Sequence, residues 1–343
     1  MPETICGAIR KRPAAASVLA AALSLFALAG CATNSPGRLL GTRQLDDSYT
    51  VSQRYDANRG EHPEFALPIV ELGDGRTILF DRRYKLIGTR ELHADIFLPT
   101  RGEASGQALV LVHGGAWRSG NKSNFYAIAS LLAKRGYAVI LPEYRLAPEA
   151  RYPAGLIDIN DAIDWTKARA ADFGIDPQRI AIGGESSGGQ MAALIAYTGG
   201  LPLFSGNGAP APRVNALIDI DGVLDFTSPL ALQYENAAGE DSMAALWLGG
   251  SMESAPEKWK EASAANYLGS NSPPTLIISG EADRFTAGRN KVVATLTAEG
   301  TPVRHVHFAG LPHTFWLFAP YVGQVADTVD SFLRNDLPPT ARH

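Results

Sequence analysis

The chain has 343 residues, of which 45% are hydrophobic and 19% are charged, and its formal net charge at pH 7 is -4. This length suffices for one large α/β domain with a sizeable core, and the lack of a basic excess argues against nucleic-acid binding. Both cysteines, Cys6 and Cys31, lie near the N-terminus, which excludes a disulfide framework or a cysteine-based zinc site elsewhere. We therefore predict a reaction without a metal or cofactor.

Residues 1–30 have the pattern of an export signal. A positive segment at 10–12 precedes an apolar stretch at 14–29, which is short for the roughly 20 residues that span a bilayer. The stretch ends in Leu-Ala-Gly-Cys at 28–31, which resembles the lipobox of bacterial lipoproteins. That resemblance implies cleavage before Cys31, lipidation of its thiol and a membrane anchor, and Ala32 resembles the outer-membrane sorting pattern. The alternative is an ordinary secretory signal with an incidental cysteine.

Residues 31–64 are polar and lack sustained apolar periodicity, so we predict a tether there and the catalytic domain over 65–343. Two β-rich runs, 77–87 and 91–98, are separated by Gly88 and Thr89 and predict an antiparallel hairpin.

Short apolar runs then alternate with helical patterns. The predicted strands are 108–112, 137–141, 179–183, 214–220, 275–279 and 303–308, and the predicted helices include 125–135, 156–172 and 322–334. This alternation indicates an α/β fold with a mostly parallel central sheet and helices on both faces. The longer connection 222–270 is a candidate cap.

The candidate nucleophile is Ser186. Residues 184–188 read Gly-Glu-Ser-Ser-Gly, which matches the nucleophile elbow G-x-S-x-G, and they lie between an apolar strand and a helical run as the elbow requires. The alternative is a structural turn that caps the helix.

A glycine-rich loop, His-Gly-Gly-Ala-Trp at 113–117, follows the strand 108–112. It resembles the loops that donate backbone N–H groups to an oxyanion. We predict an oxyanion hole made of Gly114, Gly115 and Ser187, with Ala116 as a further candidate. His113 is the alternative general base, although a histidine here more often braces the loop.

The base and acid are expected downstream if the chain order is Ser, Asp, His. His313 follows the strand 303–308, and Asp283 follows the strand 275–279, so both should emerge at the carboxyl edge of the sheet beside Ser186. We predict His313 as base and Asp283 as acid, and keep Asp225 and Glu281 as competitors for the acid. His305 and His307 lie within a strand and are expected to be structural.

The stretch 109–194 resembles the hormone-sensitive-lipase-like carboxylesterases of the α/β-hydrolase superfamily. Beyond the loop and elbow, the resemblance rests on Tyr-Arg-Leu-Ala-Pro-Glu at 144–149, Tyr-Pro-Ala at 152–154 and Gly-Ile-Asp-Pro at 174–177. It implies an α/β-hydrolase fold and ester hydrolysis. The chain departs from the family pattern at Ala116, the third position of the HGGG loop, and at the elbow, where Gly-Asp-Ser-Ala-Gly is usual. Residues 117–122 are similar to esterases that remove acetyl or feruloyl groups from polysaccharide, and also to kynurenine formamidases.

These observations predict a serine esterase for short acyl or aryl esters, with acylated carbohydrate at the cell envelope as one substrate. The alternatives are an arylformamidase or amidase of the same fold and a non-catalytic binding protein on this scaffold. Phe315, Trp316 and Phe318 either line the substrate pocket or pack in the core. The oligomeric state is left open.

Overall fold

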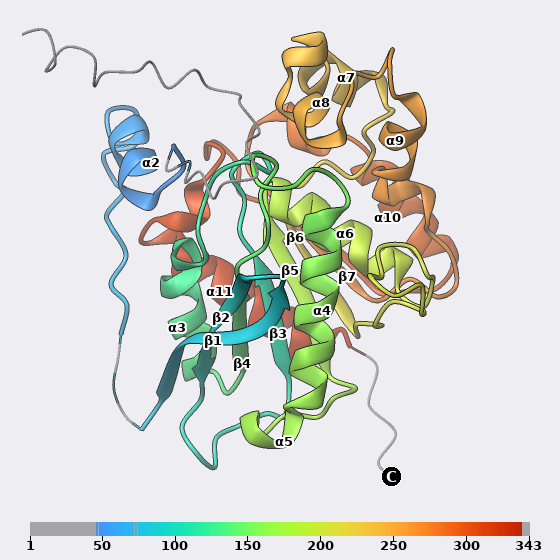
Figure 1. The fold of residues 1–343 in the computed structure, drawn as a ribbon. Coiled ribbons are helices and arrows are strands. Elements are labelled where there is room, and N and C mark those ends of the chain that lie inside the picture. The colour runs from blue at the N-terminus through green and yellow to red at the C-terminus, as the bar shows by residue number, and fades with distance from the viewer. Residues whose placement is uncertain (1–45, 47, 72, 74, 338–343) are drawn as a thin grey trace, which may run out of the picture. The chain divides into compact units, whose positions relative to one another are not determined.

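The computed structural model describes residues 46, 48–71, 73 and 75–337 (Figure 1). The predicted signal over residues 1–30 and Cys31 lie outside the described residues, as does most of the first half of the predicted tether. Within the described part of the chain, no helix is both long enough and apolar enough to cross a membrane.

An eight-stranded sheet has the order β1-β2-β4-β3-β5-β6-β7-β8. The strands are β1 (Thr77–Ile87), β2 (Arg90–Leu98), β3 (Ala108–Val112), β4 (Ala138–Pro142), β5 (Ile180–Glu185), β6 (Ala216–Ile220), β7 (Thr275–Ser279) and β8 (Val303–His307). The predicted hairpin of β1 and β2 is confirmed, β2 pairs antiparallel with β4, and the remaining neighbours are parallel. The carboxyl ends of β3 to β8 therefore meet at one edge of the sheet.

Helices cover both faces of the sheet, which is why strands such as β3 are apolar throughout. On one face lie α3 (Tyr126–Lys134) and α11 (Tyr321–Asn335), and on the other lie α4 (Ala154–Ala168), α6 (Ser187–Thr198) and α10 (Arg289–Ala298) (Figure 1). The helix predicted over 322–334 is confirmed as α11, which buries an apolar stripe that includes Val325, Val329 and Phe332. The helix predicted over 156–172 is instead two, because the chain breaks at Arg169 before α5 (Ala170–Phe173).

The segment before β1 is folded against the sheet layers. Thr50 caps the short helix α2 (Val51–Asn58) by accepting a hydrogen bond from the N–H of Gln53. Tyr49 and Phe65 are buried on either side of α2, and Phe65 stacks on Phe318 with ring centroids 4.9 Å apart. The structure thus differs from the tether predicted for 31–64. Residues 48–64 belong to the folded domain because two aromatic anchors hold an otherwise polar segment.

The connection between β6 and β7 is helical. It contains α7 (Pro229–Glu235), η2 (Gly239–Asp241), α8 (Met243–Leu248), α9 (Pro256–Glu261) and η3 (Ala264–Asn266), and Figure 1 groups α7, α8 and α9 beyond one end of the sheet. Trp247 of this region stacks on Trp117 with ring centroids 4.9 Å apart, and Trp259 is fully buried. These elements lie within 222–270, the range predicted as a cap, and Trp247 packs on the loop that follows β3.

Candidate active site

Ser186 lies at a strained turn between β5 and α6. Its backbone has φ 55° and ψ -126°, a conformation that a non-glycine residue rarely adopts. A Cβ on Gly184 would lie 2.2 Å from the carbonyl oxygen of Gly188, and one on Gly188 would lie 2.1 Å from the carbonyl oxygen of Val112. The two glycines are therefore required for the turn to close, and the strand-turn-helix context predicted for Ser186 is confirmed.

His313 joins Ser186 to a buried aspartate, Asp221. The Nε2 atom of His313 lies 3.0 Å from Ser186 Oγ, and its Nδ1 atom lies 3.0 Å from Asp221 Oδ2. Asp221 follows β6 directly and is only 1% exposed. Its other oxygen, Oδ1, accepts a hydrogen bond from the N–H of Gly280 at 2.9 Å. The three side chains form a continuous row of hydroxyl, imidazole and carboxylate.

The expectation that Asp283 occupies this row is corrected by the structure. Asp283 begins η4 (Asp283–Thr286) and is exposed, and its described hydrogen bond is made by its backbone carbonyl, which accepts from Thr286. The reason is the order of the strands. Because β6 lies between β5 and β7, the residue after β6 is the nearer neighbour of the elbow, and the turn after β7 instead donates the Gly280 N–H to Asp221.

The other competitors lie elsewhere. Asp225 accepts hydrogen bonds from Thr227, and Glu281 accepts one from the N–H of Gly310. His113 stacks on Tyr144 with ring centroids 4.6 Å apart and bonds to the Gly114 carbonyl, so it braces the loop. His305 bonds to Ser279.

Asp221 itself was missed by sequence reasoning. The available signal was the run Ile-Asp-Ile-Asp-Gly at 218–222, in which an aspartate follows a buried strand directly.

The loop after β3 supplies candidate oxyanion donors, with one correction. The N–H of Gly114 donates to Glu185 Oε1 at 2.6 Å, so Gly114 is already paired. None of the hydrogen bonds among the described residues uses the N–H groups of Gly115, Ala116 or Ser187. Gly115 and Ala116 line the same cavity as Ser186, and Ser187 is the first residue of α6, where N–H groups have no helical partner. These three are the donors that the geometry leaves open to an oxyanion.

The surroundings of His313 favour its neutral form. Burial lowers the pKa of the imidazole below its ordinary value, although the hydrogen bond and charge of Asp221 oppose that shift. Phe285 stacks on the ring with centroids 3.8 Å apart, and Trp316 meets its edge at 4.9 Å. The three predicted aromatic residues, Phe315, Trp316 and Phe318, are all buried, and Trp316 makes a described ring contact with His313. A neutral imidazole beside a hydroxyl can act as a general base.

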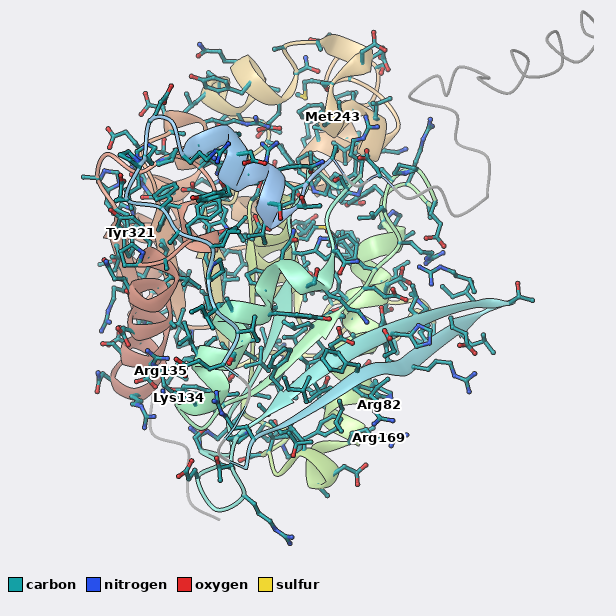
Figure 2. All side chains as sticks on the ribbon, turned by 90° about the vertical axis from the view of Figure 1, so that its left-hand side faces the viewer. Arg82, Lys134, Arg135, Arg169, Met243 and Tyr321 are labelled. Atoms are coloured by element: carbon teal, nitrogen blue, oxygen red, sulfur yellow. The ribbon has the colours of Figure 1, made fainter. Side chains whose placement is uncertain are left out.

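Two hollows adjoin Ser186. The larger has a volume of about 500 Å³ and is also lined by His313, Arg118 and Met243, the last of which is labelled in Figure 2. The smaller has a volume of about 30 Å³ and lies between Trp117 and Phe285. A substrate carbonyl at Ser186 would therefore have one spacious side and one narrow side.

The strand order, the elbow and the Ser-His-Asp row together define an α/β hydrolase. The family model described as BD-FAE matches residues 94–291, more than half of the chain, and the chain belongs to this family.

Curated relatives are named as esterases. The chain is 29% identical over 237 residues to esterase LipC of Mycobacterium tuberculosis, covering 66% of this chain and 58% of that protein. It is 37% identical over 142 residues to the probable carboxylic ester hydrolase LipM of the same organism, covering 40% and 33% of the two chains. The similarity thus spans only a third to somewhat over half the length of these two relatives.

Solved structures share the fold. A truncated form of a carbohydrate esterase from gut microbiota superposes with a TM-score of 0.64 at 22% identity, covering 79% of this chain and all of that one. A bifunctional GH43-CE protein of Bacteroides eggerthii has a TM-score of 0.61 at 26% identity, covering 78% and 38% of the two chains.

Proposed function

We propose that this chain is a serine carboxylesterase that hydrolyses short-chain acyl or aryl esters through an acyl-enzyme intermediate. The observation that carries the proposal is the row Ser186–His313–Asp221, in which both hydrogen bonds measure 3.0 Å. The esterase names of the curated relatives support the same reaction class.

Each residue of the row has one role in the proposed reaction. Neutral His313 removes the proton of Ser186 as its oxygen attacks the ester carbonyl, and later gives that proton to the leaving alcohol. Asp221 fixes the imidazole tautomer and stabilises its positive charge. The N–H groups of Gly115, Ala116 and Ser187 donate hydrogen bonds that stabilise the negative charge developing on the carbonyl oxygen. A water molecule then attacks the acyl-enzyme, with His313 again as the base, which releases the carboxylic acid and restores Ser186.

The unequal hollows favour a small acyl group on a larger alcohol. The recess between Trp117 and Phe285 has a volume of only about 30 Å³, whereas the cavity of about 500 Å³ falls in the size range of small-molecule sites. We assign the acyl group to the narrow side and the alcohol to the spacious side. Arg118 and Arg284 at the wide cavity supply hydrogen-bond donors suited to the hydroxyl groups of a sugar.

The proposed setting is the cell envelope. The support is the sequence of residues 1–31, with its positive segment, apolar stretch and terminal Leu-Ala-Gly-Cys. An exported esterase of this kind would meet acetylated or feruloylated carbohydrate outside the cytoplasm. The carbohydrate esterase among the solved structures with this fold is consistent with such a substrate.

A substrate panel tests the proposal. It should contain p-nitrophenyl esters from acetyl to decanoyl, acetylated xylan, methyl ferulate and an N-formyl aromatic amine. We expect kcat/KM to be highest for short acyl groups, from acetyl to butyryl, because the recess between Trp117 and Phe285 is small, and to fall with longer chains. Higher kcat/KM for the formamide than for every ester would favour the arylformamidase instead.

A fluorophosphonate probe tests the nucleophile in the same preparation. We expect the wild type to be labelled and the Ser186→Ala variant to remain unlabelled, with Ser187→Ala as the matched control that keeps Ser186. Absence of label and of turnover in the wild type would favour a non-catalytic binding protein.

A further inference from the structure

The segment that precedes α2 reaches the candidate active site, although it lies well before the first strand, β1, in the chain. Asp46, Ser48 and Tyr49 all line the large cavity that contains Ser186 and His313. Asp46 Oδ2 accepts a hydrogen bond from Arg118 Nε at 2.7 Å, and Ser48 donates to Ser119 at 3.2 Å. The segment is therefore attached to the loop that carries the oxyanion donors.

The third contact reaches the elbow itself. The hydroxyl of Tyr49 donates a hydrogen bond to Glu185 Oε2 at 2.9 Å. Glu185 directly precedes Ser186 and is fully buried, and its other oxygen accepts the N–H of Gly114 at 2.6 Å. One carboxyl group thus links the elbow, the loop after β3 and the N-terminal segment.

The link is tight enough to set the position of the loop. A Cβ added to Gly114 would lie 2.5 Å from Glu185 Oε2, so the carboxyl group and the loop backbone are in direct contact. Gly115 and Ala116, to whose N–H groups the proposed function assigns the oxyanion, follow Gly114 in the chain and line the cavity. A carboxyl group that lost its Tyr49 partner could rotate, and the loop would lose a fixed neighbour.

Tyr49 is itself held in place. Its side chain is 9% exposed, Arg54 lies over its ring at 5.8 Å, and the next residue, Thr50, caps α2. Helix α2 in turn contacts the core through Tyr55, whose ring is 6.1 Å from that of Phe318. The hydroxyl is presented by a folded element.

We propose that Tyr49 is a positioning residue of the esterase, which orients the oxyanion loop through the carboxyl group of Glu185. This inference rests on the proposed function. According to this inference, the N-terminal segment contributes to catalysis. The hydroxyl of Tyr49 determines how well the N–H groups of Gly115 and Ala116 are placed to donate hydrogen bonds to the oxyanion.

Tyr49→Phe removes only the hydroxyl and tests the proposal with p-nitrophenyl acetate. We expect kcat to fall about tenfold, less than the 10²–10³-fold caused by deleting an oxyanion donor outright, while KM changes by less than about twofold. The affinity for a trifluoromethyl ketone, which forms an oxyanion adduct on the serine, should weaken by the same factor as kcat/KM. Tyr55→Phe is the matched control, because it removes a hydroxyl from the same segment without touching Glu185, and it should behave as the wild type.

A second pair of variants tests whether Tyr49 acts through Glu185. In a Glu185→Leu background, Tyr49→Phe should cause no further loss of kcat, because the carboxyl group that transmits its effect is gone. Equal losses in both backgrounds, an unchanged kcat in Tyr49→Phe, or a change in KM alone would each overturn the inference. If the wild type hydrolyses esters, such results leave the proposed function intact. A wild type without turnover would instead rule out both the proposed function and the inference about Tyr49.

Discussion

The imidazole of His313 is held on four sides. Ser186 and Asp221 bond to its two nitrogen atoms, Phe285 stacks on its face, and Trp316 meets its edge. Two of these contacts are apolar and do not depend on protonation. The ring orientation is therefore fixed by packing as well as by hydrogen bonds, and a variant that loses one bond should keep the ring near its place.

The identity of the acid can be tested with two aspartates. Asp221→Asn should lower kcat by about 10³- to 10⁴-fold, because an amide cannot stabilise the imidazolium and favours the wrong tautomer. Asp283→Asn is the matched control, since Asp283 is exposed, and its kcat should stay within about twofold of the wild type. Steady-state kinetics on p-nitrophenyl acetate measure both. A large loss in Asp283→Asn with little change in Asp221→Asn would reverse the assignment.

The pH dependence of kcat/KM follows from the state of His313. The base must be neutral, so activity is lost as pH falls through the pKa of the imidazole. Because burial lowers that pKa, the acid limb should lie below the ordinary histidine value of about 6.5. Asp221 opposes the shift, so the residual activity of Asp221→Asn should show an acid limb at still lower pH. A wild-type limb above pH 7 would contradict this environment.

At the scale of elements, the elbow depends on two small residues. Gly188→Ala places a Cβ 2.1 Å from the Val112 carbonyl oxygen, a backbone atom that cannot move away without disturbing β3. We expect the variant to be destabilised by more than about 3 kcal/mol or to fail to fold, as is usual for severe overpacking. Gly323→Ala in α11 is the control, because nothing lies within 4 Å of its added Cβ. The free energy of unfolding of Gly323→Ala should rise by about 0.5–1 kcal/mol. Thermal unfolding of the two variants measures both effects.

The strands and most helices could be predicted from the sequence because their signals are local. Continuous apolar runs such as β3 and β7 mark strands buried on both faces. Ser186 directly follows the buried strand β5, whereas His313 lies six positions after β8, which is only partly buried. The acid could not be predicted in the same way. Asp221 and Asp283 both follow buried strands, and the choice depends on which strand end lies beside β5, a property of the sheet order rather than of either segment.

Two further site features lay beyond sequence reasoning for a similar reason. The pairing of Gly114 with Glu185 and the burial of Tyr49 beside it join segments separated by 71 and 136 positions. A polar stretch with one tyrosine carries no local signal for such a contact. Only the assembled sheet edge brings the three segments together.

At the scale of the whole molecule, the predicted lipid anchor calls for its own test. Cys31→Ser removes the thiol to which a diacylglyceryl group would be attached, so expression in a bacterial host with labelled palmitate should give a labelled wild type and an unlabelled variant. We expect the wild type in the membrane fraction and the variant as soluble or unprocessed protein. Cys6→Ser is the control and should be labelled like the wild type. A labelled Cys31→Ser protein would exclude the lipobox.

Because the acid follows β6, the turn after β7 is not needed to supply it. Residues of this turn instead border the hollows beside Ser186. Arg284 in that turn bonds to Glu235 at 2.6 and 2.9 Å, and Arg284 and Phe285 both border the hollows beside Ser186. The turn donates the Gly280 N–H to Asp221, and the charge of Arg284 adds to the lowering of the pKa of His313. Substitution of Arg284 would consequently change the wall of the wide cavity, and with it the alcohols that the proposed esterase accepts, together with the pH at which His313 is neutral. Asp283 and Thr286 line neither hollow, so within this turn Arg284 is the position at which selectivity and pH dependence would change together.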